Sequence, residues 1–257
     1  MEKTYTILGS RVNALAIEDL HQIISETIAT GRKCIIASQN LHGVYMARRD
    51  ERMRSFYQCA DYVRIDGMPL VLWARFLGYP LTREHRVTWV DWLKPLLCEA
   101  ASRGWRVFYL GSKPGVADAG AKRLRAEVPG VQLETAHGYF DPRPESKENQ
   151  RVVEEINAFA PHILMVGMGM PRQERWILDN FESLGANVFL PCGACIDYIA
   201  GVIPTPPRWM GRSGLEWLAR LVSEPRRLWR RYLVEPWFLV DLFVRDFTSV
   251  VLGRRQQ

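Results

Sequence analysis

The feature that most constrains the fold is a regular alternation of short apolar runs and helix-like segments. Each apolar run is rich in β-branched residues and ends in small or polar residues, which is typical of a buried strand. The six runs are CIIASQN (34–40), YVRIDG (62–67), RVFYLG (106–111), VQLETAHG (131–138), ILMVGMG (163–169) and NVFLPCG (187–193). Helical patterns lie between them, over 43–60, 89–104, 114–130, 145–161 and 173–185. The alternation predicts an α/β fold with an open, mainly parallel sheet and helices on both faces.

The composition changes at about residue 204. From there to the last residue the chain has ten arginines, four tryptophans and no lysine, and several prolines interrupt it. We therefore expect two parts, an α/β catalytic domain over 1–203 and a helical C-terminal appendage over 204–257.

The formal net charge of +6 suits a partner that bears phosphate groups, whether nucleotide, nucleic acid or lipid surface. Five scattered cysteines favour a reduced, cytosolic chain, and the pair Cys192 and Cys195 is interpreted as strand-end packing rather than a zinc or redox site. The first residues do not resemble a signal peptide. The apolar stretch over 236–253 contains three charged residues, so we do not expect it to span a membrane.

Ligands of open parallel sheets bind at the carboxyl ends of the strands, and three strand ends carry glycines or aromatic residues. Gly111 ends one strand, His137 and Tyr139 follow a second, and Gly167 and Gly169 end a third. After Gly169 a helix is predicted to begin near Pro171, with Arg172, Gln173 and Glu174 in its first turn, and its free N–H groups favour an anion. The third glycine of a dinucleotide fingerprint is absent and no P-loop occurs, which disfavours a nicotinamide or P-loop enzyme. A plain helix start remains the alternative.

Asp66 also follows a strand, before Gly67 and a helix that Pro69 can start. A carboxylate at such a place can accept a proton from an attacking hydroxyl, or it can simply cap the helix. Ser38 and Asn40 end another strand and are candidate partners in the same crevice, although strand-end turn residues look alike.

The C-terminal segment has two further patterns. Arg220, Arg227 and Arg230 are spaced by seven and three residues, which aligns them on one helical face unless Pro225 breaks the helix. Beyond them an apolar stripe recurs every three or four residues, and such a helix can lie in a membrane interface or pack against protein. We define the apolar stripe as Trp237, Val240, Val244, Phe247 and Val251.

Seven segments, in order and over most of the chain, resemble the WecG/TagA/CpsF glycosyltransferase family. They are ASQN, DYVRIDGMPLV, RVTWVDWL, HGYF, GMGMPRQERWI, CGACIDYIAG and GLEWLARLVSEPRRLWRRYL. The resemblance implies a Rossmann-like, inverting, metal-independent transferase with no cofactor. Its implied partners are a UDP-sugar donor, a polyprenyl-diphosphate-linked sugar acceptor and the inner face of the cytoplasmic membrane, where the appendage holds the protein. It also implies a role in cell-surface or exopolysaccharide biosynthesis, and a homo-oligomeric form is left open.

The resemblance also implies roles for residues. Asp66 matches the proposed general base, Ser38 and Asn40 match active-site positions, and Gln173 matches a glutamine near the donor. The appendage arginines Arg220, Arg227 and Arg230 match those thought to close over the diphosphate. Two departures, Trp89 in RVTWVDW and Thr205 in TPPRWM, leave N-acetylmannosamine-type and glucose donors both open.

Two other functions are alternatives. A basic α/β protein could bind nucleic acid through its arginine- and tryptophan-rich segment, although a nucleic-acid groove does not need a continuous apolar stripe. A retaining or hydrolytic sugar enzyme would need a close carboxylate pair, which the sequence does not suggest. No nucleic-acid partner is therefore expected.

Overall fold

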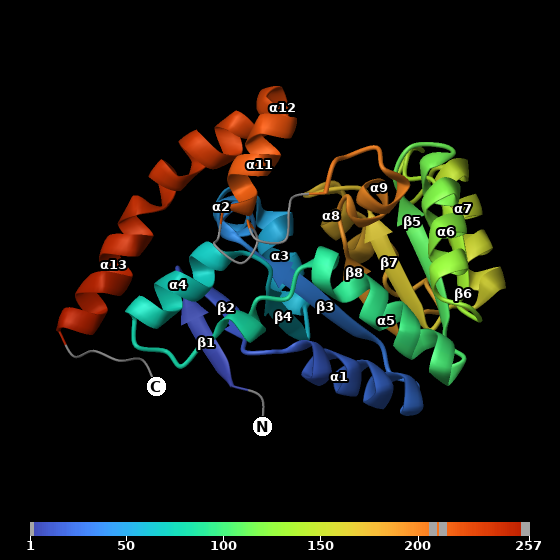
Figure 1. The fold of residues 1–257 in the computed structure, drawn as a ribbon, viewed down its shortest axis with the longest axis horizontal. Helices are drawn as coiled ribbons and strands as arrows, with labels where there is room; N and C mark the ends of the chain where they lie inside the picture. Colours follow the sequence, from blue (N-terminus) through green and yellow to red (C-terminus); the bar gives the residue numbers. More distant parts are fainter. Residues whose placement is uncertain (1–2, 206–209, 211–214, 253–257) are drawn as a thin grey trace.

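The computed structural model describes residues 3–205, 210 and 215–252, and its centre is a six-stranded parallel sheet (Figure 1). The strand order is β4-β3-β8-β7-β5-β6, and every pair in it is parallel. The strands are β3 (Cys34–Gln39), β4 (Tyr62–Ile65), β5 (Arg106–Gly111), β6 (Gln132–Ala136), β7 (Ile163–Gly167) and β8 (Val188–Pro191). These are the six predicted strands, so the predicted fold class is confirmed.

Helices cover both faces because the strands alternate buried side chains between two separate apolar clusters. One cluster packs against α1 (Ile17–Ala29), α5 (Trp89–Arg103), α6 (Val116–Glu127) and α9 (Cys195–Ala200). The other packs against α2 (Leu41–Arg49), α3 (Glu51–Cys59), α4 (Met68–Phe76), α7 (Lys147–Phe159) and α8 (Arg172–Asn180). Since strands run parallel, their carboxyl ends and the helix starts that follow them lie along one edge of the sheet.

Two features differ from the sequence-based expectation. An antiparallel hairpin of β1 (Thr4–Ile7) and β2 (Ser10–Asn13) precedes the sheet, and its four-residue strands are too short for a clear pattern. The single helical pattern over 43–60 is two helices, because Asp50 accepts hydrogen bonds from the N–H groups of Arg52 and Met53 and so starts a new helix. A short 3-10 turn, η1 (Arg83–His85), joins α4 to α5.

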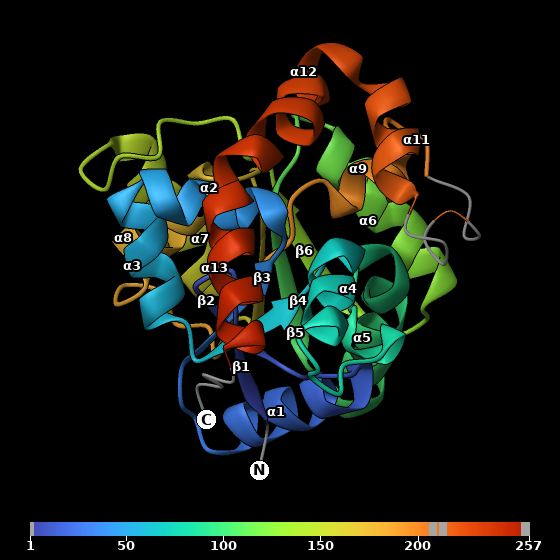
Figure 2. The ribbon, with the colours of Figure 1, turned by 90° about the vertical axis from the view of Figure 1, so that its left-hand side faces the viewer.

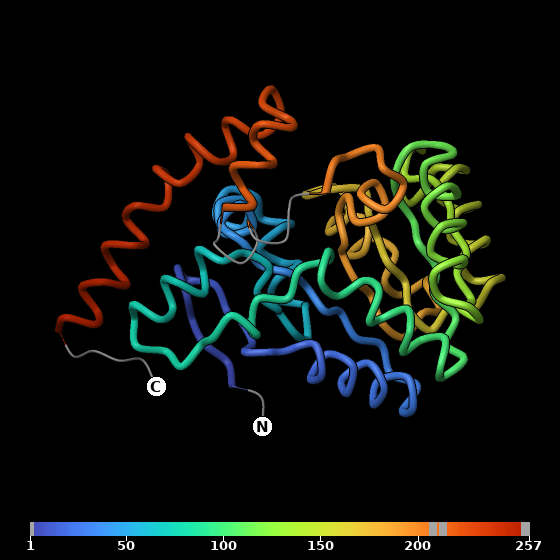
Figure 3. The backbone as a smooth tube through the Cα atoms, viewed as in Figure 1, coloured from blue at the N-terminus to red at the C-terminus, as the bar shows by residue number. Residues whose placement is uncertain are grey.

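The last described residues, 215–252, form a run of helical pieces along the β4 side of the sheet (Figures 2 and 3). They are α11 (Glu216–Ser223), α12 (Pro225–Trp229), the π-helical turn η2 (Arg230–Val234), the 3-10 turn η3 (Glu235–Leu239) and α13 (Val240–Val251). As expected, Pro225 separates α11 from α12. Helix α13 lies beside α4, where Trp73 and Phe243 are 4.6 Å apart between ring centroids. The division of the chain at about residue 204 stays a prediction.

Candidate active site

Asp66 lies at the carboxyl end of β4, beside the end of β3. Its backbone N–H donates to the carbonyl of Gln39 at 2.9 Å, which joins the two strand ends. The Asn40 side chain makes two hydrogen bonds: its Oδ1 accepts from Gly43 N at 3.0 Å, and its Nδ2 donates to Asp66 Oδ2 at 3.4 Å. Asn40 therefore starts α2 and orients the Asp66 carboxylate at the same time.

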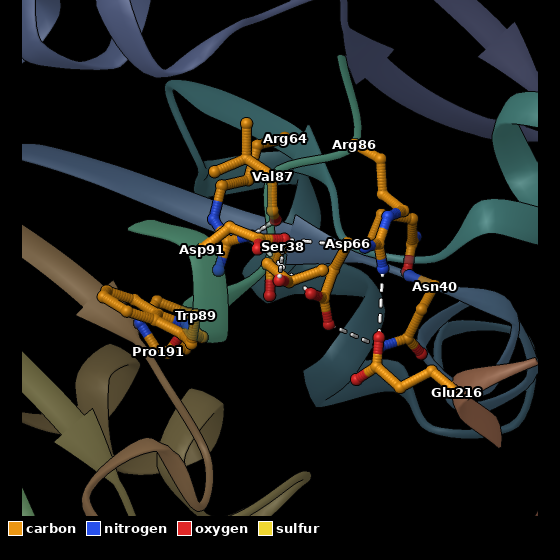
Figure 4. Close-up of polar contacts among 12 residues, drawn as sticks. Ser38, Asn40, Arg64, Asp66, Arg86, Val87, Trp89, Asp91, Pro191 and Glu216 are labelled. Carbon is orange, nitrogen blue, oxygen red and sulfur yellow. Dashed lines mark hydrogen bonds and ion pairs between the residues drawn. The ribbon is translucent and has the colours of Figure 1, made fainter. Parts of the chain in front are cut away.

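Gly67 is the residue that allows this approach, because a β-carbon there would lie 3.2 Å from the Asn40 β-carbon. Ser38 is one residue before Gln39 on β3, and Figure 4 shows it near Asp66. Its carbonyl accepts from the Tyr57 hydroxyl at 3.1 Å.

Arg64 places a buried positive charge under Asp66. Its Nη1 lies 3.8 Å from Asp66 Oδ1, and its side chain is 1% exposed. The guanidinium carbon lies 5.1 Å and 5.3 Å from the ring centroids of Trp89 and Trp92, within the range of cation–π attraction. Burial lowers the pKa of Arg64, and the charge of Asp66 opposes this effect. Nε and Nη2 have no hydrogen-bond partner in the described part of the chain, so the Asp66 carboxylate is the main compensation for this charge.

Asp66 and Asn40 open into a cavity of about 230 Å³ between the sheet edge and the C-terminal helices. The first residues of α2 and α4 form part of its wall. The lining residues are Asn40, Leu41, His42, Asp66, Gly67, Met68, Pro69, Arg86, Glu216, Trp217, Arg220, Arg231, Tyr232 and Pro236.

Two polar contacts fasten the C-terminal helices to the rim of this cavity. Arg86 donates from Nη1 to Glu216 Oε2 of α11 at 3.1 Å (Figure 4), while its Nη2 lies 3.5 Å from Asp91 Oδ2. His42 Nδ1 of α2 lies 2.5 Å from Glu235 Oε2 of η3. Because the side chains of all four residues in these two contacts are at least three-quarters buried, the contacts are shielded from water.

Two further arginines bring positive charge into the cavity. Arg220 of α11 donates from Nε and Nη2 to the Tyr198 hydroxyl at 2.8 and 2.7 Å, which fixes its direction without pairing it with a carboxylate of the described residues. Arg231 lines the same cavity and makes neither a hydrogen bond nor an ion pair within the described residues. Burial lowers the pKa of Arg231, and the Tyr232 side chain and the Asp66 carboxylate oppose this effect. The cavity is thus suited to an anionic ligand.

A model of the Glycosyl transferase WecG/TagA/CpsF family matches residues 5–250 of the chain. The chain belongs to the WecG/TagA/CpsF family. One relative is the N-acetylglucosaminyldiphosphoundecaprenol N-acetyl-beta-D-mannosaminyltransferase of Bacillus spizizenii, 28% identical over 205 residues, which are 80% of this chain and 77% of that protein. A protein of the same description from Staphylococcus aureus is 29% identical over 171 residues, or 66% of this chain and 65% of that protein. The chain thus spans just under two thirds of the length of the second relative.

The structure brings together one group of the residues predicted from the WecG/TagA/CpsF resemblance. Asp66, Asn40 and Arg220 line the cavity, and Ser38 lies on the neighbouring strand end. Arg227 and Arg230 lie outside this lining: Arg227 pairs with Glu224 at 2.8 Å, and Arg230 stacks on Trp229. Among the described arginines that follow Pro225, the one that lines the cavity is therefore Arg231.

The Pro-Arg-Gln-Glu element of the family lies at the ends of β7 and β8. Gln173 Oε1 accepts from Gly169 N at 3.0 Å and from Gly193 N at 3.1 Å, and Nε2 donates to Glu174 Oε1 at 2.8 Å. The Gln173 amide thus holds two glycine loops together while it is 5% exposed. Arg172 donates to the Phe140 carbonyl at 2.6 Å.

The remaining predicted ligands lie near this element and not in the cavity lining. A β-carbon at Gly111 would lie 2.5 Å from the Gly167 carbonyl oxygen, so the ends of β5 and β7 are pressed together there. Gly169 has a φ of +79°, which favours glycine. His137 and Tyr139 are exposed at the end of β6, where the Tyr139 N–H donates to His137 Nδ1 at 3.3 Å.

Of the two departures from the family pattern, Trp89 is buried and donates from Nε1 to the Pro191 carbonyl at 3.2 Å. The Trp89 ring packs against the Arg64 guanidinium, and Trp89 is absent from the described lining of the cavity. Thr205 is exposed, and the neighbouring Arg208 lies outside the described residues.

Sequence reasoning missed Arg64, Arg86 and Arg231 as site residues. Arg64 carries a usable signal, since an arginine inside an apolar strand is rarely buried without a partner. Arg86 and Arg231 give no such signal, because their side chains are placed by contacts between segments more than 100 residues apart in the sequence.

Proposed function

We propose that the protein transfers a sugar from a UDP-sugar to a polyprenyl-diphosphate-linked sugar in cell-surface or exopolysaccharide biosynthesis, with inversion and without a metal ion. The supporting observation is the Asp66 carboxylate, which lies in one cavity with two arginines, Arg220 and Arg231, that have no acidic partner within hydrogen-bond range in the described residues. The names of the relatives favour an N-acetylmannosaminyl group as the one transferred, to an N-acetylglucosaminyl acceptor. A glucose donor is the alternative. A sugar transferase accounts for the family match, which a nucleic-acid-binding protein does not.

In this proposal Asp66 removes the proton from the attacking hydroxyl of the acceptor sugar. The hydroxyl oxygen bonds to the anomeric carbon of the donor as the bond from that carbon to the diphosphate oxygen breaks, and UDP leaves with the bonding electrons. A single displacement of this kind inverts the anomeric carbon. Asn40 orients the carboxylate, and Arg64 compensates its charge from the buried side.

The leaving diphosphate needs positive charge, which we assign to Arg220 and Arg231 together with the starts of α2 and α4. Preorganised donors of this kind stabilise charge as it develops in the transition state. Within the described residues no group of three or more His, Cys, Asp or Glu side chains is arranged to hold a metal ion. Metal independence is part of the proposal.

The acceptor lipid implies a membrane surface, and we place it at α13. All five residues of the apolar stripe are exposed, and Phe247 stacks on Phe76 of α4 at 5.8 Å between ring centroids. Leu72 of α4 is also exposed. An amphipathic helix with such a face can lie in the membrane interface. No helix in the described ranges combines enough length with enough apolar character to cross a bilayer.

The decisive experiment replaces the proposed base. Asp66→Asn keeps the size of the side chain, so donor binding should be retained, while turnover should fall by about 10² to 10⁴ because general-base help is lost. UDP release and the anomer of the product are followed with a panel of UDP-sugars and a lipid-diphosphate acceptor. Asp118→Asn, on the exposed surface of α6, is the matched control and should leave turnover unchanged. Near-normal turnover of Asp66→Asn would remove Asp66 from this role, and a retained anomer would contradict single displacement.

A further inference from the structure

A second, larger cavity lies next to the candidate active site and plays no part in the chemistry proposed above. Its volume is about 710 Å³, and we call it the arginine groove. Its walls come from the β1–β2 hairpin, α2, α3 and α13. Gln39 lines the groove and the next residue, Asn40, lines the active-site cavity, so the two cavities meet at the junction of β3 and α2.

The charge of the arginine groove is strongly positive. Four arginines line it (Arg11, Arg48, Arg54 and Arg245), with Asp241 as the one acidic residue among its described lining residues. Arg48 pairs with Asp241 at 2.5 Å, so this carboxylate neutralises Arg48 and not the other three arginines. Within the described residues the Arg54 side chain bonds only to the carbonyls of Ala47 and Arg48, both at 3.3 Å, and Arg11 bonds to the carbonyl of Ala60. These carbonyl contacts position the guanidinium groups without neutralising them.

Arg245 closes the groove from α13. Its nearest carboxylate is the adjacent Asp246, at 3.8 Å, and that group already accepts from Leu8 N at 2.8 Å. A β-carbon at Gly9 would lie 2.9 Å from Arg245 Nη2, so the hairpin turn packs directly against the guanidinium. The arginine is therefore held beside the groove by the hairpin.

Gln39, which lines the groove, has an unused donor. Gln39 is fully buried, its Oε1 accepts from Asn40 N at 3.2 Å, and its Nε2 has no hydrogen-bond partner in the described part of the chain. A buried donor without an acceptor is costly, and an oxygen-rich anion in the groove would remove that cost. Gln39 and the arginines thus point to the same kind of ligand.

We propose that the arginine groove binds the phosphate of an anionic phospholipid headgroup. A lipid is favoured over a soluble phosphate because α13 forms one wall of the groove with Asp241, Leu242 and Arg245 and also carries the exposed apolar stripe. A protein lying on a membrane through that stripe would bring the groove to the level of the headgroups. This inference rests on the membrane location in the proposed function, but it does not depend on the sugar-transfer chemistry.

The test measures binding to vesicles without any sugar substrate. Full-length protein is sedimented with vesicles of phosphatidylcholine alone or of equal parts phosphatidylcholine and phosphatidylglycerol. Arg54→Gln with Arg245→Gln should weaken binding to the anionic vesicles about 25-fold, since each cationic side chain near an anionic surface contributes about 1 kcal/mol, a factor of about five. The matched control, Arg32→Gln with Arg151→Gln, removes the same charge from exposed positions outside the groove and should change binding less than about twofold.

A charge-preserving pair, Arg54→Lys with Arg245→Lys, should recover most of the binding, and circular dichroism verifies that each variant is folded. Equal losses in the groove pair and the control pair would overturn the proposal, as would equal binding of the wild type to neutral and anionic vesicles. Calorimetry with inorganic phosphate tests whether the groove binds a soluble phosphate instead of a lipid headgroup. The lipid proposal would also be overturned if Arg54→Gln with Arg245→Gln abolished phosphate binding but left vesicle binding intact. Turnover with a detergent-solubilised acceptor is measured separately, so a failure of the groove is distinguishable from a failure of the transferase proposal.

Discussion

Glu174 gives the sharpest prediction about stability, because it is a carboxyl group buried in a place where ionisation is costly. It is 2% exposed, and its Oε2 has no hydrogen-bond partner within the described residues. Burial raises the pKa of Glu174 from its ordinary value of 4.5 to about 7, against the opposing effect of the hydrogen bond from Gln173. The folded protein therefore holds a proton that the unfolded chain releases at lower pH.

The sign of the effect follows from which state loses its proton first. Below pH 4.5 both states are protonated at this position and the free energy of unfolding is unaffected. Between pH 4.5 and about 7 the unfolded chain is ionised while the folded protein is not, so the free energy of unfolding falls as the pH rises. Above pH 7 the penalty stays constant at about 3 kcal/mol, from about 1.36 kcal/mol for each pKa unit.

Glu174→Gln should remove this penalty while it keeps an oxygen for Gln173 Nε2. At pH 8 the variant should be more stable than the wild type by about 3 kcal/mol, and at pH 4 the two should be nearly equal. Urea unfolding followed by tryptophan fluorescence across this pH range gives the free energies. Glu154→Gln, on the exposed face of α7, is the control and should change stability by less than about 0.5 kcal/mol at any pH. A Glu174→Gln variant that is less stable than the wild type at pH 8, or equally shifted at both pH values, would refute the reasoning.

Three further outcomes are expected. Arg231→Gln should lower kcat/KM for the donor about 10- to 100-fold, since a charge-assisted hydrogen bond contributes roughly 1.5 to 3 kcal/mol. Arg230→Gln is the control and should keep kcat/KM within about threefold of the wild-type value. A larger loss in Arg230→Gln than in Arg231→Gln would show that the cavity is assigned to the wrong arginine. Gln173→Ala should lower the free energy of unfolding by about 1 to 3 kcal/mol, because the partly buried N–H groups of Gly169 and Gly193 lose their acceptor; a thermal unfolding curve matching that of the wild type would contradict this role of the side chain. EDTA should leave turnover unchanged in the UDP-release assay, and activity that disappears and then returns with added Mg²⁺ would exclude the metal-independent mechanism.

Much of the fold was predictable because its signals are local. Each of the six strands is a short apolar run between turn residues, and each long helix between them has an amphipathic period. The break between α2 and α3 was missed because Asp50 reads as one more charged residue on a helix surface until its side chain is seen to accept two backbone N–H groups. The β1–β2 hairpin was missed because its strands are four residues long.

The site was predictable only in part, because the spacing of residues in the sequence does not tell which distant residues lie close together in the fold. Asp66 and Asn40 could be paired in advance, since both follow parallel strands and such strand ends share one edge of a sheet. The C-terminal arginines could not be placed, because the irregular turns η2 and η3 shift which residues face the cavity. The register that aligns Arg220, Arg227 and Arg230 in a continuous helix is lost at Pro225, and Arg231 faces the cavity instead of Arg230.

The two parts of the cavity come from opposite ends of the sequence, and this division has a consequence for catalysis. The proposed base lies on the rigid sheet edge, whereas Arg220 and Arg231, which have no acidic partner within hydrogen-bond range in the described residues, lie on the helices that carry the apolar stripe. Polar contacts such as Arg86 to Glu216 and His42 to Glu235, together with ring contacts such as Trp73 to Phe243, hold those helices over the base. In the proposed function, a surface that fixes the position of these helices also fixes the charges assigned to the leaving diphosphate. Binding to the membrane would then supply the acceptor lipid and complete the cavity in the same event, which limits donor turnover away from the acceptor.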